Sequence, residues 1–420
     1  MPGPSRPRRR ALAGGLLVTL LAGSGLEAGA AAQMAVASPA AAASHRPAAA
    51  RDLRLRPLAV RVPAKDRTTH RAPAPAASPA TSPVRHGARA LRLSTLGSGT
   101  VGRSSASPVP RVGPHSGTLA TFTTRYTVGG AGYVLRMVGT DPSGPAATTV
   151  VDNTLVPVTV HVGGQTVAPS ASTLTAVASS GLFADRTWPG GTGQYGDVFV
   201  RTQFWSALGA GSKAWHVELA APQVATPLVI DVPASQGLVR TVRGVRVAFV
   251  DVDWFDARLQ ARATAPTPDV LTQFLAGNLV LCKPFSTDLA DCGVGGYHSA
   301  TLDDAGTHTY SYQAFLAATV FGPGSGFSDL GPMSHELAEW MADPFTDNAV
   351  PPWTSPLAPQ YGCVDALEPG DPVVGHYLTV GGLTYQDEAY LWWFLRQSPS
   401  AGWLGRYTWL GTFSTVSPPC

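Results

Sequence analysis

The strongest constraint on the fold is a change in composition near residue 116. Residues 33–115 consist mainly of Ala, Pro, Ser, Arg and Thr, with few large apolar side chains. Such a segment cannot bury enough apolar surface to offset its conformational entropy, so we predict a disordered arm. A folded core must come from residues 116–420, which we predict to form one globular domain.

Residues 1–32 have the pattern of a secretory signal peptide. Four arginines between residues 6 and 10 form a basic start, residues 11–26 form an apolar run, and small residues follow at 28–32. The apolar run is short and Gly-rich for a membrane span, and we find no other stretch long enough. We therefore expect a secreted, extracellular protein with no membrane span after the signal is cleaved.

The two parts of the chain carry opposite charge. Residues 1–116 contain 17 Lys and Arg against 3 acidic residues, a net charge of +14, whereas the remainder contains 13 against 24, a net charge of −11. A basic arm can contact an anionic cell wall, a membrane or nucleic acid, or it can be a solvated tether or a pro-segment. Residues 33–116 contain no aromatic side chain for base stacking, so we expect no nucleic-acid partner.

All four cysteines lie in the predicted domain: Cys282, Cys292, Cys363 and Cys420. In an exported chain an even number indicates disulfides, and four cysteines allow three pairings. We favour Cys282–Cys292, which is local, and Cys363–Cys420, which would fix the C-terminus. A zinc site of four thiolates is the alternative, but no CxxC spacing supports it.

The domain shows both strand and helix patterns. Segments rich in β-branched residues predict strands at 118–128, 133–138, 156–162, 215–219, 228–232 and 245–252. Apolar spacing and helix punctuation predict helices at 196–208, 270–279, 331–343 and 386–397, while 309–320 fits either state. We therefore predict an α+β fold: a mixed twisted sheet with the helix at 331–343 packed on it, preceded by the disordered arm.

The most informative motif lies in the predicted helix at 331–343, which has a proline at each end. On a helix His335 and Glu339 share one face, and Glu336 lies about 100° round from His335. This is the HExxH zinc motif with its second His replaced by Glu, and zinc accepts a carboxylate at about 2.0–2.2 Å as well as an imidazole. We therefore predict that this helix is a zincin-like metal-site helix. His335 and Glu339 are the predicted metal ligands, and Glu336 is the predicted general base.

The same residues could instead form an exposed amphipathic helix whose acids are simply solvated. The charge pattern argues against that interpretation, because no Lys or Arg occurs between residues 322 and 395. Four of the five Glu that follow the signal peptide fall between 336 and 388. A cation would relieve this imbalance.

A three-ligand metal site needs a further group. The candidates are Glu368 and Asp371, then Glu388 on the next predicted helix, then His376. Asp343 lies about 12 Å along the helix axis from His335, too far for a direct ligand, so we expect it to hold a loop or the outer side of a ligand.

Other polar and aromatic groups have two interpretations each. His298 and His308 can line the same pocket, or they can be hydrogen-bonded structural residues. The apolar helix predicted at 386–397 can pack in the core or form a substrate-binding wall. Asp251 and Asp253 end a predicted buried strand, where they can bind calcium or cap a helix.

The segment around the motif resembles a known family. His-Glu-x-x-Glu-Trp-Met-x-Asp-Pro, then Cys363, then Leu-Glu-x-Gly-Asp-Pro and a segment with Trp-Trp-Phe, is similar to secreted bacterial zinc-peptidase-like proteins of the HExxE type. A more distant similarity is to the plant EXORDIUM-like, phosphate-induced extracellular proteins. The resemblance covers about residues 280–415. It implies that one site contains His335, Glu336, Glu339, Glu368 and Asp371, and that residues 296–298 belong to the same domain.

These patterns predict a secreted, metal-dependent hydrolase of the zinc-peptidase type. Metal-activated water would attack a carbonyl group of an extracellular peptide or protein. Zinc is the expected cofactor, and calcium is the alternative. The other hypothesis is a non-catalytic extracellular binding or signalling module, in which the same acids hold a structural cation or a glycan. No GxSxG, P-loop or dinucleotide fingerprint supports serine catalysis or nucleotide binding.

Overall fold

The computed structural model describes residues 111–112, 117–322 and 325–420, which belong to one compact unit. The predicted signal peptide lies outside the described residues, as does the predicted arm except for its residues 111–112. Those two residues form strand β1 (Arg111–Val112), which pairs in parallel with β4 (Ala147–Val151). A short part of the segment predicted as disordered is therefore β-strand.

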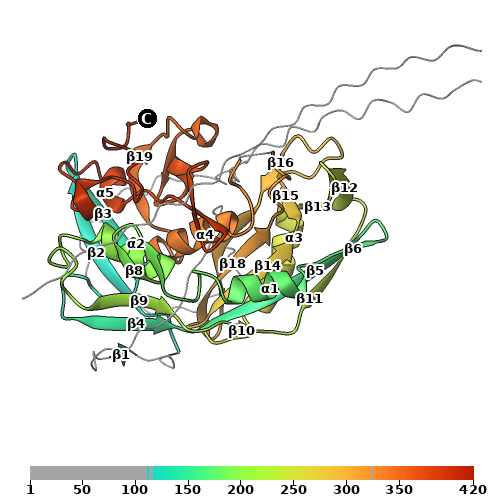
Figure 1. Cartoon of the computed structure of the whole chain (residues 1–420), viewed down its shortest axis with the longest axis horizontal. Coiled ribbons are helices and arrows are strands. Elements are labelled where there is room, and N and C mark those ends of the chain that lie inside the picture. The colour runs from blue at the N-terminus through green and yellow to red at the C-terminus, as the bar shows by residue number, and fades with distance from the viewer. Residues whose placement is uncertain (1–110, 113–116, 323–324) are drawn as a thin grey trace, which may run out of the picture. The chain divides into compact units, whose positions relative to one another are not determined.

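A mixed seven-stranded sheet carries the candidate site (Figure 1). Its strands are β5 (Asn153–Val162), β6 (Gln165–Val167), β10 (Gln223–Val224), β11 (Leu228–Val232), β14 (Leu271–Gly277), β17 (Gly296–Asp303) and β18 (Gly306–Phe315). β5, β14 and β18 are adjacent and parallel, and β17 is the antiparallel partner of β18. β10 and β11 also pair in parallel with β5, and β6 pairs with it antiparallel. The α+β class and the mixed sheet are confirmed.

Strand β14 corrects the sequence prediction of a short helix at 270–279. All seven of its residues are buried, because it lies between two parallel strands in a sheet with both faces covered. A strand buried on both faces lacks the alternation of apolar and polar residues. Periodicity alone does not distinguish such a run from a buried helix.

Helices α3 (Val252–Ala263) and α4 (Gly331–Ala342) cover opposite faces of this sheet. Phe274 of β14 packs in the apolar cluster that contains residues of α3, whereas the next residue, Leu275, packs in the cluster that contains residues of α4. Successive side chains of a strand point to opposite faces, so the two clusters lie on the two sides of the sheet. α4 contacts β17 and β18 directly.

Helix α4 is buried along its whole length, and the helix predicted at 331–343 is confirmed. Pro332 occupies the first turn, where its missing N–H removes no helical hydrogen bond. Helix α2 (Tyr195–Gln203) packs against α4; it overlaps the helix predicted at 196–208 but ends five residues earlier. At Gly196 an added Cβ would lie 2.6 Å from Met341 Cε and 3.1 Å from Leu337 Cδ2, so the two helices are close together at this position.

The remaining elements surround this centre. A four-stranded sheet contains β12 (Gly237–Val242), β13 (Val245–Asp251), β15 (Leu279–Cys282) and β16 (Cys292–Val294), and a three-stranded sheet contains β1, β4 and β9 (Trp215–Leu219). The two-stranded sheets are β2 (Thr121–Val128) with β3 (Ala131–Val138), β7 (Arg186–Trp188) with β8 (Gly191–Gly193), β19 (Ala349–Trp353) with β20 (Val364–Ala366), and β21 (Tyr377–Val380) with β22 (Leu383–Gln386). Further helical segments are α1 (Ala171–Ala178), α5 (Leu391–Phe394) and three 3-10 turns, Pro359–Tyr361, Asp371–Val373 and Trp403–Gly405. The predicted strands all overlap observed ones.

The helix predicted at 386–397 is reduced to the single turn α5. The preceding residues pair with a later segment of the chain, for example through the Trp409 N–H, which donates to the Glu388 carbonyl oxygen at 2.9 Å. These tertiary hydrogen bonds replace the local helical ones. Glu388 therefore lies in an extended segment and not on a helix. The aromatic residues of α5 pack in the core, which is one of the two roles predicted for this segment.

Both predicted disulfides are present, Cys282–Cys292 and Cys363–Cys420. Disulfides form and persist in oxidising compartments, so the pairing is compatible with a secreted protein. Among the described residues we find no helix with the length and apolar character needed to cross a membrane.

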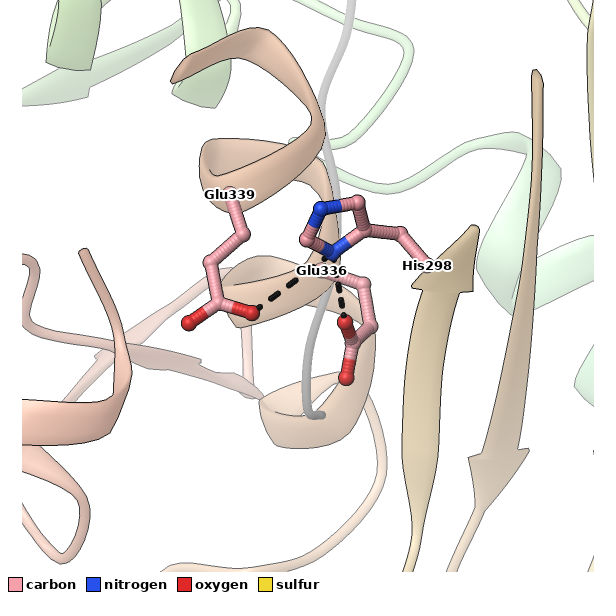
Figure 2. A group of neighbouring side chains, drawn as sticks. All are labelled: His298, Glu336 and Glu339. Atoms are coloured by element: carbon pink, nitrogen blue, oxygen red, sulfur yellow. Dashed lines mark hydrogen bonds and ion pairs between the residues drawn. The ribbon is translucent and has the colours of Figure 1, made fainter. Parts of the chain in front are cut away.

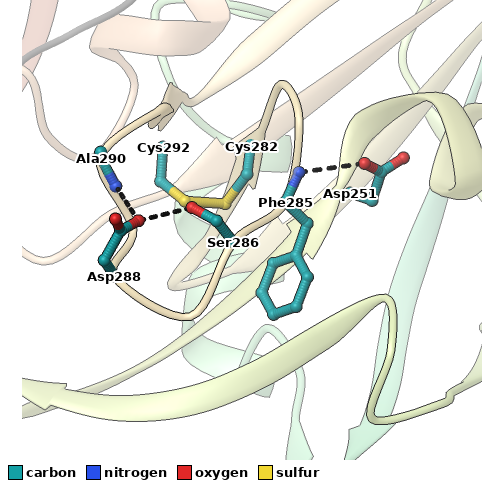
Figure 3. Close-up of a disulfide and its surroundings, with 7 residues drawn as sticks. All are labelled: Asp251, Cys282, Phe285, Ser286, Asp288, Ala290 and Cys292. Atoms are coloured by element: carbon teal, nitrogen blue, oxygen red, sulfur yellow. Dashed lines mark hydrogen bonds between the residues drawn. A yellow bond between two sulfur atoms is a disulfide. The ribbon is translucent and has the colours of Figure 1, made fainter.

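The loop that follows Cys282 is tied to the start of α3 (Figure 3). One carboxylate oxygen of Asp251 accepts the N–H of Trp254 at 2.9 Å, and the other accepts the N–H of Phe285 at 3.1 Å. Asp251 is therefore the N-cap of α3. Of the two roles considered for this residue, helix capping is the one observed.

Replacing Cys363 and Cys420 together by serine is expected to lower the free energy of unfolding by about 2–4 kcal/mol. The bridge joins residues 57 apart, so its loss frees a long loop in the unfolded chain. Urea unfolding followed by tryptophan fluorescence measures the change. The control is the Cys282→Ser, Cys292→Ser pair, whose bridge joins residues only 10 apart and should contribute less. A larger loss in the control pair would contradict this account.

Candidate metal centre

Three side chains from two separate parts of the chain meet beside the middle of α4. His335 and Glu339 lie one turn apart on the helix, and Asp371 begins the 3-10 turn Asp371–Val373. His335 Nε2 lies 2.8 Å from Glu339 Oε1 and 3.3 Å from Asp371 Oδ1. The three ligand atoms lie within 4.8 Å of one another, and all three residues are buried. We call this set the His335 group.

The contacts of His335 are compatible with a metal ligand. Neither of its ring nitrogens makes a hydrogen bond of acceptable geometry to a described residue, although Nε2 is only 2.8 Å from Glu339. Neighbouring ligand atoms around a tetrahedral ion with bonds of about 2.0–2.1 Å are about 3.3 Å apart. The observed separations are therefore close to those of a ligand set.

The backbone of Gly370 holds the His335 group in place. Its N–H donates to Glu339 Oε1 at 3.2 Å, and its carbonyl oxygen accepts a hydrogen bond from Gln386 Nε2 at 2.8 Å. The glycine lies directly against the imidazole, since an added Cβ would be 2.2 Å from His335 Cγ. A side chain at position 370 would therefore displace the ring.

A second set of side chains joins the same helix to strand β17 (Figure 2). His298 Nδ1 of strand β17 is 3.2 Å from Glu336 Oε2 and 3.7 Å from Glu339 Oε2. All three side chains are fully buried, and their ligand atoms also lie within 4.8 Å of one another. We call this set the His298 group. Glu339 belongs to both groups.

Burial disfavours every charged form in this centre. It raises the pKa of Glu336 and of Glu339 well above the ordinary value, and the neighbouring charges of Glu368 and Asp371 raise both further. Burial likewise raises the pKa of Asp371 and lowers the pKa of His335 well below its usual value. A bound cation would reverse this preference by stabilising the ionised carboxylates.

The other predicted site residues occupy different positions. Glu368 is 6% exposed and belongs to neither group in the described part of the chain, although its charge acts on both helix glutamates. Glu388 Oε1 accepts a hydrogen bond from the Tyr195 hydroxyl at 2.7 Å, outside both groups. His308 pairs with Asp303 at 2.9 Å. His376 is likewise absent from both groups.

Asp343 has the loop-holding role expected from its place at the end of the helix. Its carboxylate accepts the backbone N–H groups of Asp347 and Asn348 at 3.0–3.1 Å. Burial raises its pKa to about 7. Its backbone carbonyl oxygen lies 3.1 Å from His298 Nε2, so this residue also contacts the centre through its main chain.

Three contributors were not predicted as site residues from the sequence. Gly370 and Gln386 hold the loop against His335, and Tyr361 lies near Asp371, where its hydroxyl opposes the rise in the pKa of that carboxyl. Of these three, only Gly370 could have been predicted from the sequence, because it precedes the proposed ligand Asp371 in the Leu-Glu-x-Gly-Asp-Pro segment.

The substitution Gly370→Ala is expected to lower the free energy of unfolding by about 1–3 kcal/mol, because the new methyl group overlaps the ring of His335. Chemical unfolding of the purified protein measures the loss. Gly132→Ala is the matched control, since a Cβ there would have no atom within 4 Å. Equal stability of the two variants would show that Gly370 is not packed against His335 as described.

Comparison of the chain with protein-family models, with curated proteins and with solved structures finds no match. The resemblance to HExxE zinc-peptidase-like and EXORDIUM-like proteins therefore stays a prediction. Functional proposals for this domain therefore rest on the geometry of the His335 and His298 groups.

Proposed function

We propose that the domain is a metal-dependent hydrolase of the zinc-peptidase type, with its ion held by His335, Glu339 and Asp371. The observation that carries the proposal is the approach of one imidazole nitrogen to two carboxylate oxygens at 2.8 and 3.3 Å in a buried site. An ion here would polarise a carbonyl oxygen of a substrate and lower the pKa of a water molecule. Peptides are the proposed substrate class.

The donor set favours zinc over calcium. Calcium binds oxygen ligands almost exclusively, whereas imidazole nitrogen suits zinc and other transition metals. Each group of ligands contains one histidine, His335 or His298. Zinc also accepts carboxylate oxygens, so Glu339 and Asp371 complete the set.

Glu336 is the proposed general base. It follows His335 on α4, and its Oε1 makes no hydrogen bond to a described residue. A carboxylate with a raised pKa is better matched to accept a proton near neutral pH than an ordinary one, and burial raises the pKa of Glu336. Its other oxygen faces His298, which fixes the direction of the side chain.

Burial supports a second candidate function. His335, Glu336 and Glu339 are fully buried, and Asp371 is only 5% exposed. Structural metal sites are closed, whereas catalytic sites keep a coordination position for substrate or water. The alternative is therefore a non-catalytic extracellular module in which the same ion is structural. Only the hydrolase loses turnover when Glu336 is changed, so the two functions are separable.

Removing the ion is expected to destabilise the protein. The carboxylates would then have to be protonated or remain buried without a counter-charge. Zinc at about 100 times its dissociation constant should stabilise the native state by about 2.7 kcal/mol. Thermal unfolding with a chelator, and again after zinc is restored, measures this difference. An unfolding temperature that responds to neither treatment would contradict a metal centre of either kind.

The substitution Glu336→Gln is expected to reduce hydrolysis of a fluorogenic peptide library about 10²–10⁴-fold, because the general base is lost. The ion at the His335 group should remain, which metal analysis checks. Glu388→Gln is the matched control: it is an equally buried glutamate, and its partner Tyr195 can still donate to the amide oxygen. Full turnover by Glu336→Gln, or none by the wild type, would favour the structural role.

A further inference from the structure

The tautomer of His298 is fixed by its surroundings. Its Nε2 lies 3.1 Å from the carbonyl oxygen of Asp343, and a carbonyl oxygen can only accept a hydrogen bond. Nε2 must therefore carry the hydrogen. With its hydrogen on Nε2, a neutral imidazole presents a lone pair at Nδ1.

That lone pair faces two carboxylates. Glu336 Oε2 is 3.2 Å from Nδ1 and Glu339 Oε2 is 3.7 Å from it, as Figure 2 shows. Three potential ligand atoms thus converge within 4.8 Å of one another. A single proton on one carboxyl group can be donated to one acceptor only, whereas a cation can bind all three atoms. A histidine held by a backbone carbonyl through its other nitrogen is also the usual arrangement of a metal ligand.

The carboxylate of Glu339 connects this site to the first one. Its Oε1 faces His335 Nε2 at 2.8 Å, and its Oε2 faces His298 Nδ1 at 3.7 Å. The two oxygens of one side chain therefore belong to two different ligand groups. In two-metal sites the two ions lie about 3.5–4 Å apart, so one carboxylate can bind both ions.

The donor types agree with two ions. The two groups together offer two imidazoles and the carboxylates of Glu336, Glu339 and Asp371. The charges of Glu368 and Glu388 also act on Glu339. Two cations would compensate more of this buried negative charge than one. Imidazole and carboxylate donors are also those of di-iron and di-manganese carboxylate proteins.

We infer that His298, Glu336 and Glu339 form a second cation site, so that the domain holds a dinuclear centre bridged by Glu339. The inference rests on the proposed function for its first ion and adds the second. Glu336 then binds the second ion through Oε2, and its Oε1 stays available for proton transfer. The site takes a divalent transition metal, since one of its three donors is an imidazole.

Zinc stoichiometry tests the inference. The purified protein is stripped with a chelator, reloaded with Zn²⁺, freed of excess metal and analysed for zinc per chain. We expect two zinc ions in the wild type, one in His298→Ala, and two in the matched control His308→Ala. His308 is a similarly buried histidine of the neighbouring strand, but it pairs with Asp303 outside both groups.

The outcomes separate this inference from the proposed function. One zinc per wild-type chain, kept in His298→Ala and lost in His335→Ala, would overturn the second site and leave the hydrolase proposal standing. One zinc lost in both variants would mean a single shared ion and would also overturn it. No zinc in the wild type would overturn both proposals.

A measurement on the wild type alone covers the case in which His298→Ala does not fold, which circular dichroism reveals. The stripped protein is saturated with Mn²⁺ and examined by electron paramagnetic resonance. Two ions bridged by Glu339 should give the spectrum of an exchange-coupled pair. Signals of isolated Mn²⁺ at saturation would overturn the dinuclear centre.

Discussion

The structure depends on how acidic side chains are kept inside the protein without a cationic residue beside them. Glu336 and Glu339 are completely buried, and the sequence supplies no Lys or Arg between residues 322 and 395. An uncompensated buried carboxylate costs several kcal/mol, so each must be protonated or paired with a cation. His335 lies on the same helix as these acids, whereas strand β17 brings His298 to them and the loop after Cys363 brings Asp371.

The backbone around the acids orients them more than other side chains do. The Asp343 carbonyl fixes the tautomer of His298, and the Gly370 N–H fixes one oxygen of Glu339. Such outer contacts determine how a ligand points and how strongly it binds. They also explain why the centre can be fully enclosed, since backbone groups take up less space than additional side chains.

The sequence predicted the position of His335 and Glu339 on helix α4 better than it predicted the elements around them. The spacing of His335 and Glu339 places both on one helix face whatever the rest of the fold, so this part was accessible from local periodicity. The contact between His298 and Glu336 could not be predicted from local periodicity, because it depends on which face of β17 meets α4. The helix expected at 270–279 failed for a related reason: a parallel strand covered on both faces loses the alternation that identifies strands.

The ligands of the two groups come from a strand, a helix and a loop that are separated by tens of residues, from 298 to 371. Contacts over such separations form late, since the intervening chain must first be ordered. A cation held by the two groups would therefore join parts of the chain that the fold has to bring together over long separations, unlike zinc in small finger domains, whose ligands are close in sequence.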